Sequence, residues 1–303
     1  MEQWLPFKFS EGVVACPKIS PERKVGFVDR DGKTVIDAKF DAARPFNEGL
    51  AAVRIKGKWG YISHDGKFAI EPQFEAVGVL DYPGDDPMDF ADGLAAVRSD
   101  ELVGFIDKTG KFVIPPKFTS AWSFNDGLAA AQDRFTGKWG FVDKQGKWAI
   151  KPSFADALSF SEGIAAVSTR SRAEGPSWGY INKSGSFLIK PKYAMALACH
   201  EGLALVLTLN NGVYDGKFID KKGDAAFANM NCHGSNAYNE GLAPFMSKDR
   251  KMGFIDKSGK IVITPQFQEA RSFSEGAAVV RIDDSNWGLI GKNGKLIFSR
   301  SVK

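Results

Sequence analysis

Two cysteine–histidine pairs have the most distinctive chemistry in this sequence. Cys199 is followed by His200 and Cys232 by His233, and the chain has only one other histidine. Two thiolates and two imidazoles can form a tetrahedral zinc shell, but zinc motifs usually place paired ligands two to four residues apart. Adjacent side chains point in different directions. We therefore expect a buried thiol beside a surface imidazole and no cofactor. A zinc site and a Cys199–Cys232 disulfide are the alternatives.

A second candidate for chemistry is a carboxylate that precedes a glycine eight times along the chain. Acid–base catalysis uses a few carboxylates in unlike environments, whereas these eight occupy equivalent positions. An acidic residue beside a tight glycine turn can instead accept backbone N–H bonds. We therefore predict an architectural role for all of them. The positions are Glu11, Glu48, Asp92, Asp126, Glu162, Glu201, Glu240 and Glu275.

Two irregular insertions are the predicted partner contacts, because binding residues concentrate on loops that depart from a regular scaffold. Residues 78–89 are acidic, and residues 168–177 are basic. Calcium is an alternative occupant of the acidic insertion, although its spacing does not match an EF-hand loop. The residues predicted to contact a partner are Asp81, Tyr82, Asp85, Asp86, Asp89, Arg170 and Arg172.

Known catalytic motifs are missing from the sequence. It contains no G-x-S-x-G, Walker loop, HExxH or G-x-G-x-x-G pattern. With three histidines in total, few candidates exist for acid–base catalysis by imidazole. We therefore expect a protein that is not an enzyme.

One short unit repeats along the whole chain. Its opening Trp-Gly marker returns every 34 to 44 residues, and its Glu-Gly-Leu marker returns in step. The eight copies leave no room for another domain, so residues 1–303 are predicted to form a single repeat domain. The glycines of the first marker are Gly26, Gly60, Gly104, Gly140, Gly179, Gly253 and Gly288, with Lys217 in the sixth copy.

The repeat resembles the WG-repeat (KWG-repeat) family of bacterial proteins. The segments KWGYISHDGKFAIEPQF at 58–74 and KWGFVDKQGKWAIKPSF at 138–154 show the resemblance best. It implies a β-rich repeat scaffold and brings no agreed activity with it. The sixth copy departs most, through Lys217 and the divergent stretch 225–237.

Each copy is predicted to contain three short strands, as in 50–54, 59–62 and 68–70. The glycine between the second and third strands fits the left-handed position of a type I turn with a G1 bulge. The connector that follows, such as 118–124, has apolar residues three apart, which favours one or two helical turns. The turn glycines are Gly32, Gly66, Gly110, Gly146, Gly185, Gly223, Gly259 and Gly294.

The tryptophan of the first marker could serve as a sugar-stacking platform or as a core residue. Val25, Val103 and Met252 fill the same slot in other copies. A slot that accepts valine and methionine requires apolar volume and no aromatic face. We therefore predict that these side chains are buried.

The two ends of the chain complement each other in the repeat. The sequence opens on a lone 11–15 strand and closes on a 287–298 hairpin, so the N-terminal strand is predicted to complete the last copy. The expected fold is an all-β, propeller-like ring of eight repeats latched by the termini, because closure removes exposed sheet edges. An open solenoid of hairpins is the alternative.

Composition limits the partners. The net charge of +4 gives no dense basic surface for nucleic acid, and no run of 18 apolar residues could span a membrane. Three cysteines suit a cytoplasmic protein, with an exported form whose signal is removed as the alternative. We expect a scaffold that binds another protein through irregular rim loops. A module that binds a small molecule or glycan in a central opening or inter-repeat groove is the second hypothesis.

Overall fold

The computed structural model describes residues 8–17, 24–75, 89–210, 212–227 and 237–301. These residues form strands joined by turns, apart from one 3-10 helix, η1 (Arg172–Glu174). The described part of the chain holds no helix with the length and apolar character needed to cross a membrane. The strands build seven sheets, and the chain divides into two compact units.

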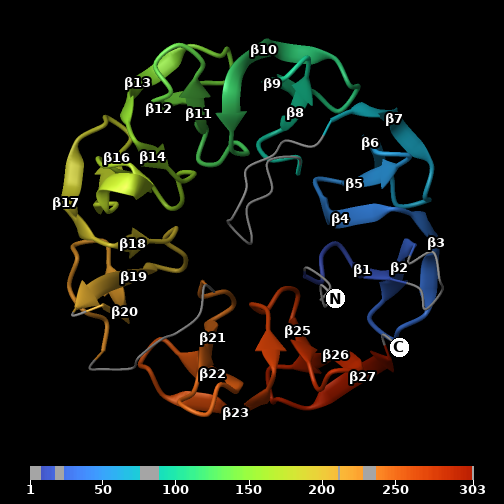
Figure 1. Cartoon of the computed structure of the whole chain (residues 1–303). Coiled ribbons are helices and arrows are strands. Elements are labelled where there is room, and N and C mark those ends of the chain that lie inside the picture. Colours follow the sequence, from blue (N-terminus) through green and yellow to red (C-terminus); the bar gives the residue numbers. More distant parts are fainter. Residues whose placement is uncertain (1–7, 18–23, 76–88, 211, 228–236, 302–303) are drawn as a thin grey trace. The chain divides into compact units, whose positions relative to one another are not determined.

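Unit 1 combines Met1–Phe74 with Tyr238–Lys303 and holds four antiparallel sheets (Figure 1). These sheets consist of β1 (Val13–Pro17), β2 (Val25–Asp29) and β3 (Thr34–Phe40); β4 (Ala42–Asn47), β5 (Leu50–Ile55), β6 (Lys58–Ile62) and β7 (Phe68–Phe74); β21 (Leu242–Met246), β22 (Met252–Asp256) and β23 (Ile261–Phe267); and β24 (Glu269–Ala270), β25 (Ala277–Arg281), β26 (Asn286–Gly291) and β27 (Leu296–Ser301).

Unit 2, Glu75–Ala237, holds the other three antiparallel sheets. These consist of β8 (Ala95–Ser99), β9 (Leu102–Ile106), β10 (Phe112–Ala121), β11 (Ala129–Asp133), β12 (Trp139–Val142) and β13 (Trp148–Phe154); β14 (Asp156–Ala157), β15 (Ile164–Ser168), β16 (Trp178–Asn182) and β17 (Phe187–Tyr193); and β18 (Met195–Ala196), β19 (Leu203–Asn210) and β20 (Val213–Asp220).

Eight repeats occupy seven sheets because β10 serves two of them. This strand pairs with β9 of its own repeat along one part and with β11 of the next repeat along another, which joins six strands into one sheet. The repeat count therefore exceeds the sheet count by one, which a repeat length alone could not predict.

The predicted hairpin between the second and third strands is confirmed. In the second repeat, Gly66 has φ of 74° and donates its N–H to the Ser63 carbonyl at 2.9 Å. The Ser63 N–H in turn bonds the Lys67 carbonyl at 3.0 Å, which closes the bulged type I turn. Only glycine adopts this φ without a steric penalty, which explains why the slot never varies.

The connector is extended and not helical, so that prediction was wrong. After the third strand of the fourth repeat, its residues form β14, which pairs with β15 of the fifth repeat through Asp156↔Ser168 and Ala157↔Val167. Apolar residues three apart over so short a segment do not distinguish a helical turn from an irregular strand. Pairing with the next repeat decides the outcome and supplies a short inner strand.

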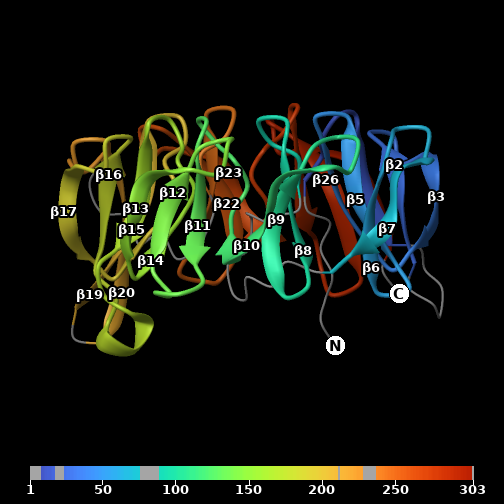
Figure 2. The same cartoon turned by 90° about the horizontal axis from the view of Figure 1, so that it is seen from above.

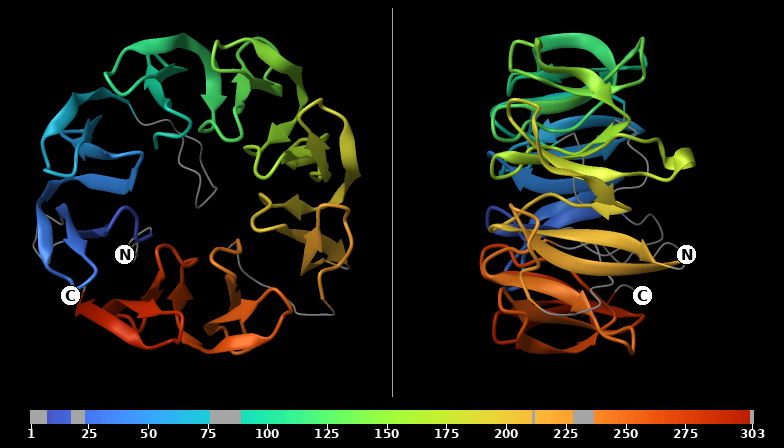
Figure 3. Two further views of the ribbon diagram at one scale, coloured as in Figure 1. Left: turned by 180° about the vertical axis from the view of Figure 1, so that it is seen from behind. Right: turned by 90° about the vertical axis from the view of Figure 1, so that its left-hand side faces the viewer.

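The N-terminal strand completes its own repeat and not the last one, which corrects the predicted strand exchange. β1 pairs with β2, whereas β27 pairs with β26 in its own four-stranded sheet. The first and last repeats nevertheless pack together within unit 1 (Figure 3), as one core cluster joins Val14 and Val28 to Val279 and Leu289. Side-chain packing connects these ends where the sequence suggested a shared sheet.

Candidate functional site

The Glu-Gly marker forms a tight turn with unusual backbone angles. In the first repeat Glu11 has φ of 51° and Gly12 has φ of 81°, and the flanking Ser10 and Val13 exchange backbone hydrogen bonds. Two successive positive φ values define a type I′ hairpin turn. Glutamate pays a steric penalty in this region, so its recurrence there calls for a compensating role of the side chain.

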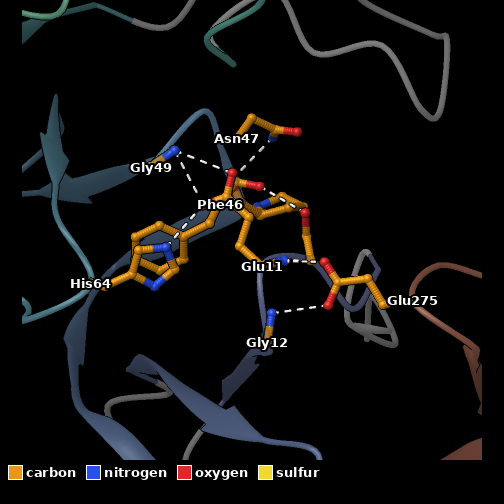
Figure 4. Close-up of polar contacts among 9 residues, drawn as sticks. Glu11, Gly12, Phe46, Asn47, Gly49, His64 and Glu275 are labelled. Atoms are coloured by element: carbon orange, nitrogen blue, oxygen red, sulfur yellow. Dashed lines mark hydrogen bonds and ion pairs between the residues drawn. The ribbon is translucent and has the colours of Figure 1, made fainter.

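That role is a bond between repeats, which we call the carboxylate clasp: one repeat's turn carboxylate accepts N–H bonds from the turn of the following repeat. Both oxygens of Glu11 lie 3.1 Å from the Gly49 nitrogen (Figure 4). Glu275 of the last repeat binds the first in the same way, through the Glu11 nitrogen at 2.6 Å and the Gly12 nitrogen at 3.0 Å.

The clasp recurs inside both units. Each carboxylate reaches a glycine N–H one repeat ahead, at ordinary hydrogen-bond distance. The further pairs are Asp92 with Gly127 (2.8 Å), Asp126 with Gly163 (2.6 Å), Glu162 with Gly202 (2.9 Å) and Glu240 with Gly276 (3.0 Å). Six of the eight recurring acids therefore accept backbone N–H bonds as predicted, with the donors in the next repeat.

A basic side chain from the next hairpin completes several clasps. Lys221 Nζ lies 3.1 Å from Glu162 Oε2, and Lys292 Nζ lies 3.1 Å from Glu240 Oε2. His64 takes this slot in the second repeat, with Nε2 2.9 Å from Glu11 Oε2 and its ring stacked on Phe46 at 4.0 Å between centroids. Sequence reasoning missed this set, although a basic residue follows the hairpin aspartate or asparagine in most copies.

The electrostatics of two clasps are alike. Burial raises the pKa of Glu162, but hydrogen bonds from Lys221 and from the Gly202 and Glu201 nitrogens outweigh burial and lower the pKa overall. Burial likewise raises the pKa of Glu240, and the Gly276 and Lys292 donors again leave it lowered. Acid–base catalysis needs carboxylates whose environments push their pKa values apart, and these two are pushed the same way.

The tryptophan slot is buried in each repeat where it is described, as predicted. Trp59 is the most exposed at 8%, and Val103 is fully buried. An indole in such a slot has no face open for a stacked sugar ring. The seven side chains are Val25, Trp59, Val103, Trp139, Trp178, Met252 and Trp287.

The glycine that follows the tryptophan slot is required for a steric reason that the sequence did not reveal. A Cβ on Gly60 would lie 2.6 Å from the Ile70 carbonyl oxygen and 2.7 Å from the Pro72 nitrogen. The third strand bulges here, because the pairs Trp59↔Phe74 and Tyr61↔Ile70 leave two extra residues on β7. The bulge brings backbone against backbone, so a side chain has no room.

In the sixth repeat Lys217 fills this slot, and the described residues after β20 (221–227) include no third strand opposite it. After β20 the described residues form a turn in which the Asp220 nitrogen bonds the Asp224 oxygen, then the bridge Ile219↔Ala225 and the bond from the Ala226 nitrogen to the Phe218 oxygen. No bulged strand among the described residues crosses Lys217, whose side chain is exposed. The divergence noted in the sequence thus has a structural counterpart.

The cysteine–histidine pairs are only partly described. Cys199 is 1% exposed and fills a slot that is phenylalanine or tyrosine in the other repeats, while His200 is half-buried. Burial, followed by the nearby Glu162 charge, raises the pKa of the Cys199 thiol to about 11. Cys232 and His233 lie outside the described residues, within which no cluster of three potential metal ligands occurs.

Only some of the residues predicted to contact a partner lie in the described part of the chain. Asp81, Tyr82, Asp85 and Asp86 lie outside the described residues. Asp89 is half-buried, and its carbonyl accepts the Ser123 hydroxyl at 3.3 Å. Arg170 is exposed, and Arg172 begins η1. These contacts remain predictions.

Exposed apolar residues in unit 2 are a feature that sequence reasoning missed. Phe135, in the turn between β11 and β12, is 80% exposed, and Leu209, Val213 and Tyr214 are more than half exposed at the end of the β19–β20 hairpin. We call these four residues and Arg170 the hairpin surface, because all lie in or beside the turns between the first and second strands of consecutive repeats. Figure 2 shows η1 and the β19–β20 hairpin projecting on the same side. The extended LTLNNGVYD stretch was the available signal.

The comparisons with known proteins agree with the repeat. A family model described as "WG containing repeat" matches residues 26–59, 59–82, 104–134, 139–171, 178–212 and 252–284. No curated protein shows significant sequence similarity to the chain.

Solved structures with a similar fold cover nearly the whole chain. BamB from Moraxella catarrhalis is 10% identical with a TM-score of 0.54, over 97% of this chain and 95% of that one. A eukaryotic initiation factor is 13% identical with a TM-score of 0.57, over 96% and 84%. Hsv2p of Kluyveromyces lactis is 10% identical with a TM-score of 0.51, over 98% and 97%.

Identities this low establish the fold alone, which is the all-β, propeller-type arrangement predicted from the repeat. The matched segments cover more than half of the residues and follow the repeats already defined by their turns and clasps. The chain belongs to the WG containing repeat family.

Proposed function

We propose that this chain is a non-enzymatic scaffold that binds another protein through the hairpin surface of unit 2. The supporting observation is how the recurring residues are used: described turn carboxylates bind neighbouring repeats, and the tryptophan slots are buried. Chemistry available for recognition therefore lies where the repeats differ. A propeller-type fold that presents unlike loops is typical of protein-interaction scaffolds.

The composition of the hairpin surface favours a protein partner. The Arg134 guanidinium lies 4.5 Å from the centroid of the Phe135 ring, and the exposed Arg170 lies in the adjacent repeat. Aromatic residues and arginine are enriched at protein interfaces. A sugar-binding role gains no support from the indoles of the Trp-Gly slots, since those four are buried.

A triple variant tests the proposal. Phe135→Ser, Leu209→Ser and Tyr214→Ser together remove the apolar side chains, while Val35→Ser, Val262→Ser and Ile297→Ser change three comparably exposed side chains of third strands in unit 1. Affinity capture from native lysate, with quantitative mass spectrometry, should recover one partner in stoichiometric amount with wild type and the control. At least tenfold lower recovery is expected with the hairpin variant. Equal recovery by all three proteins, or no stoichiometric partner, would overturn the proposal.

A further inference from the structure

The outer edge of β20 differs from the equivalent edges in the other repeats. In the fifth repeat the outer side of β16 is covered by β17, with Trp178 opposite Tyr193 and Tyr180 opposite Ile189. The corresponding residues of β20 are Gly216 and Phe218, judged from their pairing with the preceding strand. This edge normally holds an extended strand.

Only one end of the β20 edge is covered by described residues. The Phe218 carbonyl accepts the Ala226 N–H at 3.0 Å on the outer side. Backbone groups of a strand alternate in direction, so those of Gly216 and Tyr214 also point away from β19. The described residues provide no hydrogen-bond partner for these outward groups. Within the described part of the chain, the edge therefore presents two N–H donors and two carbonyl acceptors in the spacing of a strand.

Lys217 determines what kind of strand this edge can accept. The repeat's own third strand bulges across the glycine slot, where a Cβ on Gly179 would lie 2.4 Å from the Ile189 oxygen. The Cβ of Lys217 stands in the same slot, so a bulged strand of the I-x-P type would collide with it. A regular strand without a bulge leaves room for a side chain at that position.

Apolar side chains flank the open part of the edge. Leu209 lies directly opposite Tyr214, and they are 53% and 51% exposed. Paired positions put both side chains on one face of the hairpin. Proteins usually protect an edge strand with charges, proline or a covering segment, because exposed apolar edges recruit other strands. Here the apolar pair lies beside the two outward-facing backbone positions.

We propose that the outer edge of β20 binds an extended, unbulged strand of a partner protein, with apolar side chains at alternate positions against Leu209 and Tyr214. This inference rests on the proposed scaffold function and names its docking edge. Backbone bonds to Gly216 and Tyr214 supply affinity, and the apolar pair selects the strand.

The test is selection of linear twelve-residue peptides displayed on phage against the full chain, with counter-selection on Tyr214→Pro. Proline removes the outward N–H at an edge position that tolerates it. Tyr214→Ala removes the side chain and keeps that N–H. Enriched peptides should alternate apolar and polar residues and lack central proline. The Kd of these peptides, measured by fluorescence anisotropy, should rise at least tenfold with Tyr214→Pro and by less with Tyr214→Ala. Methylation of alternate peptide nitrogens should also raise the Kd at least tenfold.

Several results would overturn the proposal. One is that no peptide is enriched. Another is that peptides selected on wild type bind Tyr214→Pro equally well. A third is that peptides bind only after residues 228–236 are replaced by a Gly/Ser linker. Self-association of wild type that Tyr214→Pro abolishes would identify a second copy as the occupant. Matching thermal unfolding of the variants excludes misfolding. If the triple serine variant loses its partner while Tyr214→Pro retains both partner and peptides, the docking edge fails and the scaffold function stands.

Discussion

At the residue scale, Glu162 illustrates how a reactive group becomes architectural. Its carboxylate accepts backbone N–H bonds from Glu201 and Gly202 and pairs with Lys221. Hydrogen bonds to a charged group are stronger than those between neutral groups, so the ionised carboxylate of Glu162 joins the two repeats best. The strained φ of the turn glutamates is offset by these bonds.

Replacing Glu162 with glutamine should lower the free energy of unfolding by about 1 kcal/mol at pH 7, the usual size of a partly exposed charged hydrogen bond. The folded-state pKa of Glu162 is lowered. The stabilisation is therefore complete above the unfolded value and is lost as pH falls through the folded value. Urea unfolding at pH 7 and pH 3 measures this, with the exposed Glu71→Gln as control. A wild-type-to-variant difference that does not shrink between pH 7 and pH 3 would contradict the assignment.

The thiol of Cys199 should be unreactive in the folded chain. Burial raises its pKa from 9.0 to about 11, which reduces the thiolate fraction at pH 8 about 100-fold. Iodoacetamide labelling, followed by mass spectrometry of the Cys199 peptide, should be at least 100-fold slower in buffer than in guanidinium. Similar rates in both conditions would show that the thiol is accessible.

At the element scale, the bulged third strand explains the Trp-Gly marker. Gly60→Ala should destabilise the chain by about 1–3 kcal/mol, the range for a group forced into packed surroundings. Lys217 fills the same slot in the sixth repeat, where no bulged strand is described. Lys217→Ala should therefore change the free energy of unfolding by about 0.5 kcal/mol or less. Thermal or urea unfolding of both variants provides the comparison. An innocuous Gly60→Ala would mean that the bulge does not constrain this position.

The sequence predicted local elements better than their connections. Turn glycines such as Gly66 follow from a single dihedral angle, and the tryptophan slot follows from substitution by Val103 and Met252. The connector was misjudged because its strand character arises from pairing with the next repeat. The clasp partners and the β1 pairing are likewise contacts between segments whose registration no local pattern encodes.

At the scale of the whole molecule, each unit is stabilised by repeated contacts between neighbouring sheets. In unit 1 these contacts include the first and last repeats, where Arg30 bonds the Gly276 carbonyl at 3.3 Å and Arg300 approaches the Cys16 sulfur at 3.4 Å. Nearest-neighbour contacts of this kind make stability roughly a sum over interfaces. The candidate surface could not be predicted from such regularity, because residues such as Leu209 and Tyr214 interrupt it.

The most direct test of the architectural role of the recurring acids is one triple variant: Glu11→Gln, Glu162→Gln and Glu240→Gln. These clasps join separate pairs of repeats, so their effects should add to about 3 kcal/mol in the free energy of unfolding from urea titration. Partner capture by the folded variant should equal that of wild type. Unchanged stability together with lost capture, or with loss of a catalytic activity, would show instead that the acids form a functional site.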